Sequence, residues 1–180
     1  MTYLNDSGFV LKRFNLGEAD RFITLFTKDN GKVEVLAKGV RKITSKRASH
    51  IEPLNLIRFN SVRTSKNFIL TEVELLNSFE QRKSTLKQCE IAFFVCELID
   101  GLCPQGQVSS EIFFMIGRFL RGGEYSDSEL LNFETKILSS LGYWNVENKF
   151  ANEGEARLYI ESILEKKMKS RIIGNFSSQS

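Results

Sequence analysis

The chain has 180 residues, a formal net charge of +3, 42% apolar residues and 26% charged residues. This composition is typical of a globular protein and excludes bulk disorder, which requires low hydrophobicity and high net charge. The longest apolar runs are far shorter than the roughly 18 residues of a membrane span, and the polar segment 1–8 lacks the apolar stretch of a secretory signal. The three cysteines, an odd number, indicate free thiols in a reducing compartment. We therefore expect a cytoplasmic protein that does not associate with membranes.

Positive charge is concentrated in the first half of the chain. Residues 1–80 carry 13 Lys and Arg against 9 Asp and Glu, whereas residues 81–180 carry 12 against 13. No acidic residue lies between Glu34 and Glu52. This acid-free stretch contains Lys38, Arg41, Lys42, Lys46 and Arg47. Such a cluster repels itself unless it faces solvent or a polyanion, so it indicates either a solvated loop or a nucleic-acid contact.

Five segments of the first half alternate apolar and polar residues, which is the pattern of half-buried strands. The predicted strands are 7–14, 21–27, 32–40, 53–60 and 68–76. The Asn30-Gly31 pair favours a tight hairpin between the second and third strands. Five strands with one long polar loop favour a small barrel of the OB-fold type, although a half-open sheet packed on helices would show a similar pattern.

The second half has apolar residues at helical spacing. The predicted helices are 84–103, a segment capped by Ser109 or Ser110 and stopped by Gly122, a segment capped by Ser126 or Asp127 and stopped by Gly142, and 154–169. The change of period near Phe79 predicts a domain boundary. The fold class is therefore α+β, with a five-stranded OB-fold barrel over residues 1–80 followed by an all-helical domain over residues 81–180.

The sequence contains no recognisable catalytic or metal-binding motif. The single histidine, His50, has no nucleophile motif near it, and neither a P-loop nor a GxGxxG pattern occurs. Cys89, Cys96 and Cys103 are seven residues apart, which on a helix separates successive sulfurs by about 10 Å, too far for one metal ion. We interpret them as small apolar residues on a buried stripe. The sequence thus predicts no enzyme, no catalytic residue, no metal and no cofactor, with a hydrolase as a distant alternative.

Phenylalanines are frequent near the basic stretch, at positions 9, 14, 22, 26, 59 and 68. Aromatic rings next to cations can stack on nucleic-acid bases. Most of these rings are better explained as barrel core, and Phe9, which shares a face with Leu11, is the clearest case. The assignment of Phe14, Phe26 and Phe59 stays open at this point.

Several short motifs occur in a characteristic order. They are GFVLKR (8–13), GEADR (17–21), TLFT (24–27), AKGVRK (37–42), FETKILSSLGY (133–143) and KSR (169–171). In sequence and spacing they resemble the bacterial DNA repair protein family RecO, whose N-terminal domain matches the first four motifs. GEADR and AKGVRK together carry most of the specificity.

The resemblance implies an OB-fold followed by a helical domain, and a recombination mediator rather than an enzyme. The family binds single- and double-stranded DNA, anneals complementary strands and, with RecR, loads RecA onto strands coated by single-strand-binding protein (SSB). It also binds the acidic tail of SSB through the helical domain, and RecF is a further partner. The implied location is the bacterial cytoplasm, at the nucleoid. Many members carry a four-cysteine zinc site after the Leu141-Gly142-Tyr143 signature, where this chain has no cysteine, so we expect no zinc.

The resemblance and the charge pattern together indicate candidate site residues. The predicted phosphate contacts are Arg13, Arg21, Lys38, Arg41, Lys42, Lys46 and Arg47. Arg21 follows Glu18 and Asp20, so a structural ion pair is an alternative for it. For the carboxylate of the SSB tail we predict Arg118 and Arg121, which lie beside Phe114 and Phe119.

Two other classes of function are compatible with the sequence. One is a protein-interaction module, in which the helical half binds a partner and the barrel is a scaffold. The other is an RNA-binding or translation-associated OB-fold protein, because OB-folds bind both nucleic acids.

Overall fold

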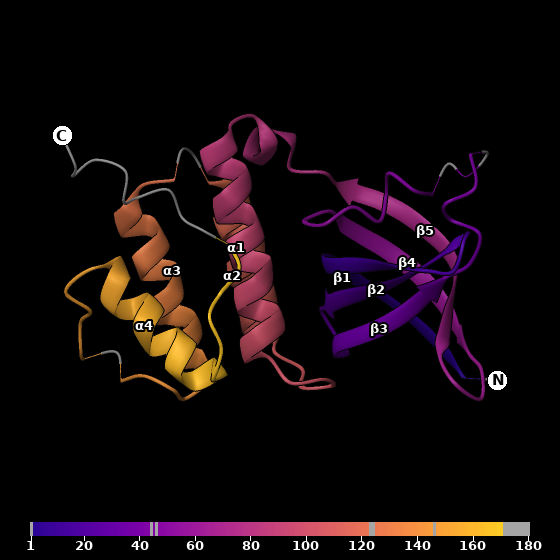
Figure 1. Cartoon of the computed structure of the whole chain (residues 1–180). Helices are drawn as coiled ribbons and strands as arrows, with labels where there is room; N and C mark the ends of the chain where they lie inside the picture. Colours follow the sequence, from indigo (N-terminus) through magenta and orange to yellow (C-terminus); the bar gives the residue numbers. More distant parts are fainter. Residues whose placement is uncertain (1, 44, 46, 123–124, 146, 171–180) are drawn as a thin grey trace. The chain divides into compact units, whose positions relative to one another are not determined.

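The computed structural model describes residues 2–43, 45, 47–122, 125–145 and 147–170. They form two compact units, a strand-rich unit and a helical unit (Figure 1). The strand-rich unit extends to Glu80 and includes Pro104–Ser110, which comprises the connection between two helices and the first residue of the second. The sequence predicts two domains that meet after residue 80, and their independence in folding and function stays a prediction.

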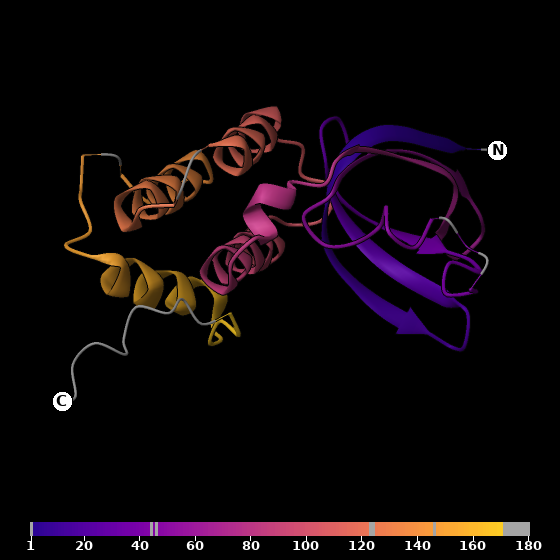
Figure 2. The ribbon, with the colours of Figure 1, turned by 90° about the horizontal axis from the view of Figure 1, so that it is seen from above.

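The strand-rich unit is a closed barrel in the order β1-β2-β3-β5-β4. Its strands are β1 (Tyr3–Leu16), β2 (Asp20–Thr27), β3 (Gly31–Ala37), β4 (Leu56–Arg63) and β5 (Phe68–Asn77). All pairings are antiparallel except that of β3 with β5, which is parallel. The predicted OB-type barrel is confirmed, and closure excludes the half-open sheet. Figure 2 shows the strands wrapping around the barrel.

The barrel core is built from the inward-facing residues that alternate along each strand, such as Ile23, Leu25 and Val35, all fully buried. The connection between β3 and β4 also contributes to this core, because Val40 and Ile51 are fully buried in it. The connection is therefore partly core, and not only the polar loop that the sequence predicts.

The third strand is shorter than predicted, and the fourth is shifted. β3 ends at Ala37 because Gly39 adopts a left-handed conformation (φ 65°), and β4 begins at Leu56, after Leu54 at φ 74°. Two backbone bonds fix this second turn, from Leu54 N to the carbonyl of Val10 at 2.8 Å and from Val10 N to that of Asn55 at 2.9 Å.

The segment 104–110 packs on the hairpin between β2 and β3. Gly106 N donates to the carbonyl of Lys32 at 3.0 Å, and Gln105 forms an isolated parallel bridge with Lys32. At Gly31 (φ 65°) a β carbon would collide with the backbone of Gln107. Glycine is thus required here both for the turn and for the close approach of this segment.

The helical unit contains a short 3₁₀ turn, η1 (Glu80–Lys83), whose first residue counts with the barrel, and four α-helices. These are α1 (Leu86–Leu102), α2 (Ser110–Arg121), α3 (Asp127–Ser140) and α4 (Glu153–Leu164). The predicted helical half is confirmed. Of the two predicted N-caps of α3, Ser126 is the one observed, and it forms a capping box with Glu129.

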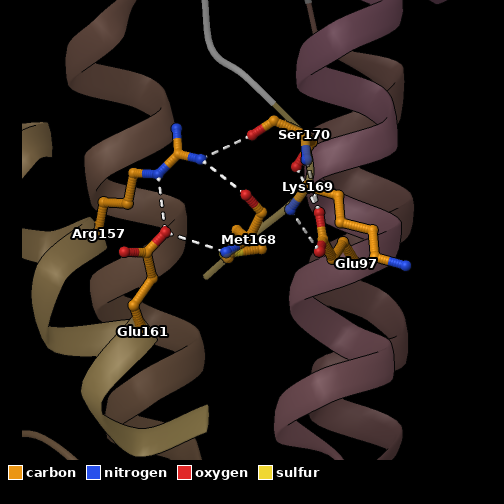
Figure 3. Close-up of polar contacts among 6 residues, drawn as sticks. All are labelled: Glu97, Arg157, Glu161, Met168, Lys169 and Ser170. Carbon is orange, nitrogen blue, oxygen red and sulfur yellow. Dashed lines mark hydrogen bonds and ion pairs between the residues drawn. The ribbon is translucent and has the colours of Figure 1, made fainter. Parts of the chain in front are cut away.

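Helix α4 ends five residues before its predicted end, and the chain then folds back on the helices. Glu165 takes a left-handed conformation (φ 52°), which ends the helix. Figure 3 shows Glu97 of α1 and Arg157 of α4 directed at the segment 168–170. The Glu97 carboxylate accepts from the backbone N–H groups of Lys169 and Ser170, both at 2.8 Å, and Arg157 donates to the carbonyl of Ser170 at 2.8 Å.

Candidate nucleic-acid interface

The basic stretch begins with a segment, residues 39–41, whose backbone is hydrogen-bonded to the rest of the barrel. This segment is bonded to the β1–β2 turn and to the start of β2, because Arg41 N donates to the carbonyl of Ala19 at 2.9 Å and Gly39 N donates to Asp20 Oδ1 at 2.7 Å. Val40 between them is fully buried. We call residues 38–47 the basic loop. At residues 38–42, buried and hydrogen-bonded backbone therefore alternates with exposed basic side chains.

Four of the five predicted loop cations fall within the described residues, and Lys46 lies outside them. Lys38, Arg41 and Lys42 are exposed. Arg41 Nη1 donates to the carbonyl of Gly17 at 2.7 Å, so this side chain fastens the loop to the turn. Arg47 is half-buried and donates from Nη2 to the carbonyl of Lys38 at 3.0 Å. Both guanidinium groups keep further N–H donors for an anion, since arginine has five.

An open hollow in the barrel surface brings the loop and the turn together. It is lined by Ala19, Asp20, Lys38, Gly39, Lys42, Ser45 and Arg47. Three of these residues are cations, and the one acid, Asp20, is engaged by the backbone of Gly39. The hollow is therefore a positively charged surface with several backbone and side-chain donors, which suits a phosphate group.

Arg13 and Arg21 occupy a different environment. Arg13 Nη2 lies 2.7 Å from Glu52 Oε2, and Arg21 Nη1 lies 3.5 Å from Glu52 Oε1. Arg21 Nε also donates to Asn15 Oδ1 at 3.2 Å. Burial and then the charge of Arg13 lower the pKa of Arg21, while Glu52 opposes this shift. The two arginines share one carboxylate, so they offer a phosphate less net charge than the loop does.

The acidic partner of Arg21 was not expected from the sequence. The local candidates were Glu18 and Asp20, yet the ion pair is made by Glu52, 31 residues away. Glu52 is the first acid after the acid-free stretch, and that position was the only sequence signal for its role.

The six phenylalanines considered from the sequence divide clearly. Phe9, Phe26 and Phe59 are buried in the barrel, at 2%, 0% and 1% exposure. Phe68 is half-buried, with the guanidinium of Arg63 over its ring at 5.1 Å. Phe14 of β1 is 49% exposed and stacks on Phe22 of β2. The position of Phe14 on the outer face was not resolved by the sequence pattern.

A second candidate surface lies within the helical unit, between α2 and α3. This hollow of about 280 Å³ is lined by Met115, Arg118, Phe119, Gly122, Tyr125, Glu129, Asn132, Phe133 and Lys136. The ring of Phe119 stacks on Tyr125 and Phe133, with centroid distances of 4.6 and 4.4 Å. Arg118 thus lies beside an aromatic wall, and its contact with a tail carboxylate stays a prediction. Arg121 is exposed and does not line the hollow, whereas Lys136 does so without having been predicted.

The cysteines lie along α1 and its cap as free thiols. Cys96 and Cys103 are buried, and Cys89 is half-buried with its thiol 3.5 Å from the carbonyl of Lys83. In the parts of the chain that the structure describes, no three His, Cys, Asp or Glu side chains come together as a metal site would require. Within the same parts, the helices are too short or too polar to cross a bilayer.

Comparison with known proteins shows which family the chain is similar to. The family model "Recombination protein O N terminal" matches residues 1–79. "DNA repair protein RecO" of Pelotomaculum thermopropionicum is 30% identical over 136 residues, which is 74% of this chain and 53% of that protein. The protein of the same name from Symbiobacterium thermophilum is 31% identical over 147 residues, 79% of this chain and 58% of the relative. That from Clostridium acetobutylicum is 28% identical over 183 residues, 99% of this chain and 74% of the relative.

These alignments cover the helical unit as well as the barrel, because the longest extends over nearly all of the chain. The chain nevertheless spans little more than half the length of the first two relatives. The similarity therefore concerns a common barrel and helical region rather than the whole of those longer proteins.

Proposed function

Because the chain belongs to the RecO family of bacterial DNA repair proteins, we propose that it is a DNA-binding recombination mediator. It binds single- and double-stranded DNA, anneals complementary strands and, with RecR, helps to load RecA onto SSB-coated strands. The family consists of mediators and not of enzymes, so no chemical step is assigned. The observation that carries the DNA-binding part is the acid-free basic loop, fastened by its backbone to the β1–β2 turn.

The physical task of an annealing protein is to bring two polyanions together. A cationic surface lowers the repulsion between the strands and gains free energy by releasing counterions. Lys38 and Lys42 are exposed at the hollow, and Arg41 and Arg47 keep donors beside it. Lys46 belongs to the same proposal by its sequence position. Phosphate contacts carry no base information, so we expect little sequence preference.

Arg13 and Arg21 contribute to the same proposed surface in a weaker way. Glu52 already neutralises part of their charge at 2.7 and 3.5 Å. A phosphate must therefore compete with this carboxylate, and the proposed contribution of the two arginines depends on salt and on Glu52.

For the acidic tail of SSB we propose the hollow between α2 and α3. Its aromatic wall accommodates an apolar end group, and Arg118 with Lys136 supplies positive charge for carboxylates. Arg121 is a more distant contact in this proposal, since it does not line the hollow. RecR, RecF and RecA are proposed partners without assigned residues, and the bacterial nucleoid is the proposed location.

The two alternative classes lead to different binding results. A protein-interaction module would bind the SSB tail peptide but not DNA, and the helical hollow is the observation that favours it. An RNA-binding protein would prefer an RNA strand over the DNA strand of the same sequence, because the 2′-hydroxyl distinguishes the two.

The decisive experiment measures the affinity for an oligo(dT) strand over a range of salt concentrations. The test variant is Lys38→Gln with Lys42→Gln, which leaves the loop's backbone bonds and Arg41 intact. The matched control is Lys28→Gln with Lys66→Gln, which removes two exposed lysines of the same barrel outside the loop. We expect the test variant to bind more weakly and its log–log salt slope to flatten by about 1.4, that is about 0.7 per lost contact.

The control variant should keep the affinity and slope of the unchanged protein. Equal losses in the two variants would mean that only the overall charge matters and that the basic loop is not the DNA surface. A competition with an RNA strand of matching sequence, and a titration with an SSB tail peptide, decide between the proposal and its alternatives.

A further inference from the structure

We infer that the exposed ring of Phe14, supported from behind by Phe22, is a stacking face for an unpaired base of single-stranded nucleic acid. The inference rests on the proposed DNA-binding function and adds to it a contact that recognises bases rather than phosphates. The base-binding role is thereby assigned to the outer face of β1 and β2, next to the basic loop.

The two rings form a fixed pair across neighbouring strands. Phe14 and Phe22 are register partners of β1 and β2, their centroids are 5.2 Å apart, and their planes are inclined by 20°. Phe22 is half-buried and Phe14 is 49% exposed. A ring held on one side by another ring loses little conformational entropy when a base adds to it, which makes it a preformed stacking face.

The neighbourhood of the pair supplies positive charge for the attached phosphates. Lys12 is exposed and lies two residues before Phe14, so it points to the same side of β1. On the other side of Phe22, Lys38 follows the last residue of β3, one position after the Arg21–Ala37 pair. Two strand spacings separate β1 from β3, about 10 Å. The aromatic pair thus has one cation two residues away on its own strand β1, and a second directly after the end of the neighbouring strand β3.

The basic loop is joined to this hairpin by direct bonds. Arg41 donates to the carbonyls of Gly17 and Ala19, in the turn that links the strands of Phe14 and Phe22. A strand bound along the loop therefore passes the end of the hairpin that carries the aromatic pair. This charge complementarity favours a nucleic acid over an apolar protein partner as the occupant of the face.

Stacking on Phe14 is available only to bases that are not paired in a duplex. An aromatic contact of this kind accepts any base, because every base has a π face. The inference therefore predicts a preference for single strands over duplexes, without a sequence preference.

The test compares Phe14→Leu with the unchanged protein on three ligands. These are oligo(dT), the same strand with its central nucleotides replaced by abasic sites, and a duplex. Leucine retains an apolar side chain against Phe22 but removes the stacking ring. The matched control is Tyr3→Leu, which removes a 66% exposed aromatic residue at the other end of β1.

We expect Phe14→Leu to weaken oligo(dT) binding about 5- to 150-fold, the range for loss of one stacked base. Binding to the abasic strand and the duplex should change less than about twofold, and the salt slope should be unaltered because phosphate contacts remain. Tyr3→Leu should leave all three affinities unchanged. In a Phe14→Trp variant, oligo(dT) should quench the added indole fluorescence, with Trp144 of the unchanged protein as background.

The test distinguishes a failure of the stacking inference from a failure of the proposed function. If the unchanged protein binds oligo(dT) with a steep salt slope while Phe14→Leu binds it equally well, the stacking face is wrong and the proposed function stands. If the unchanged protein binds no single strand, both are overturned. A loss for Phe14→Leu that is equal on the abasic strand would also refute stacking, because no base is present there.

Discussion

Glu52 binds two arginines at once, Arg13 at 2.7 Å through Oε2 and Arg21 at 3.5 Å through Oε1. The three residues come from β1, β2 and the connection to β4, so the ion pairs join segments that are distant in sequence. The carboxylate also reduces the positive charge that Arg13 and Arg21 can offer to phosphates at the proposed DNA surface. We therefore expect its charge to affect both the stability of the barrel and the proposed binding of DNA.

Substitution of Glu52 by Gln should raise the affinity for oligo(dT) at low salt and steepen the salt slope, because Arg13 and Arg21 are released toward phosphates. The loss of unfolding free energy should stay at or below about 1 kcal/mol, since the pair is partly exposed. Glu74→Gln is the matched control, because it releases Arg58 from a 2.9 Å pair on β4 and β5. Equal affinities for Glu52→Gln and the unchanged protein would remove the two arginines from the proposed surface.

Substitution of Gly31 by Ala should destabilise the barrel more than Gly17→Ala does. Both glycines have positive φ, 65° and 57°, so each alanine costs about 1–2 kcal/mol in conformation alone. At Gly31 the new β carbon also meets the backbone of Gln107, whereas at Gly17 nothing lies within 4 Å. Urea unfolding of the two variants measures the difference, and identical midpoints would show that the packing of segment 104–110 contributes nothing.

The stability of the helical unit should fall as the pH rises from about 5 to 8. Burial, and after it the charge of Glu153, raises the pKa of Glu134 to about 8, although the charge of Arg157 opposes this shift. The folded state therefore holds a proton that the unfolded state, near pKa 4.5, has lost. Each pH unit in this window costs up to about 1.4 kcal/mol.

Thermal unfolding of Glu134→Gln at pH 6 and pH 8 tests this assignment, because glutamine cannot titrate. The variant should show a weaker pH dependence than the unchanged protein and a higher midpoint at pH 8. Some dependence should remain, since burial also raises the pKa of Glu153. A variant with an unchanged pH dependence would show that Glu134 is not the titrating group.

The segment 168–170 should loosen when Glu97 is replaced by Gln. Burial raises the pKa of Glu97, but the hydrogen bonds from Lys169 and Ser170 outweigh burial and hold the pKa below its ordinary value. The folded state thus favours the ionised carboxylate, and this contribution to stability is lost as the pH falls below about 4.5. We expect amide exchange at Lys169 and Ser170 to accelerate about tenfold in the variant, the equivalent of about 1.4 kcal/mol.

Glu165→Gln is the control for this measurement, because it neutralises an exposed glutamate just before the same segment. Its exchange rates at Lys169 and Ser170 should match those of the unchanged protein. Equal rates in Glu97→Gln as well would mean that Arg157, which donates to the carbonyls of Met168 and Ser170, is sufficient to hold the segment.

The local patterns of the sequence were enough to predict the architecture. Period-two alternation identified all five strands, and helical spacing identified all four helices, because side-chain periodicity reflects which face is buried. Their ends were less predictable. The early ends of β3 and α4 follow from left-handed residues at Gly39 and Glu165, and the second of these is not a residue type that signals such a turn.

The sequence by itself determined the barrel, the helical half and the acid-free charge of the basic loop, since these depend on neighbours along the chain. Only the tertiary structure decided that Glu52 pairs with Arg13 and Arg21. It also decided that Val40 and Ile51 of the β3–β4 connection belong to the core, and that Phe14 is exposed while Phe26 is buried. These relationships join residues on different strands. They arise when the barrel closes, because closure sets which side chains face the core and which distant charges come within contact.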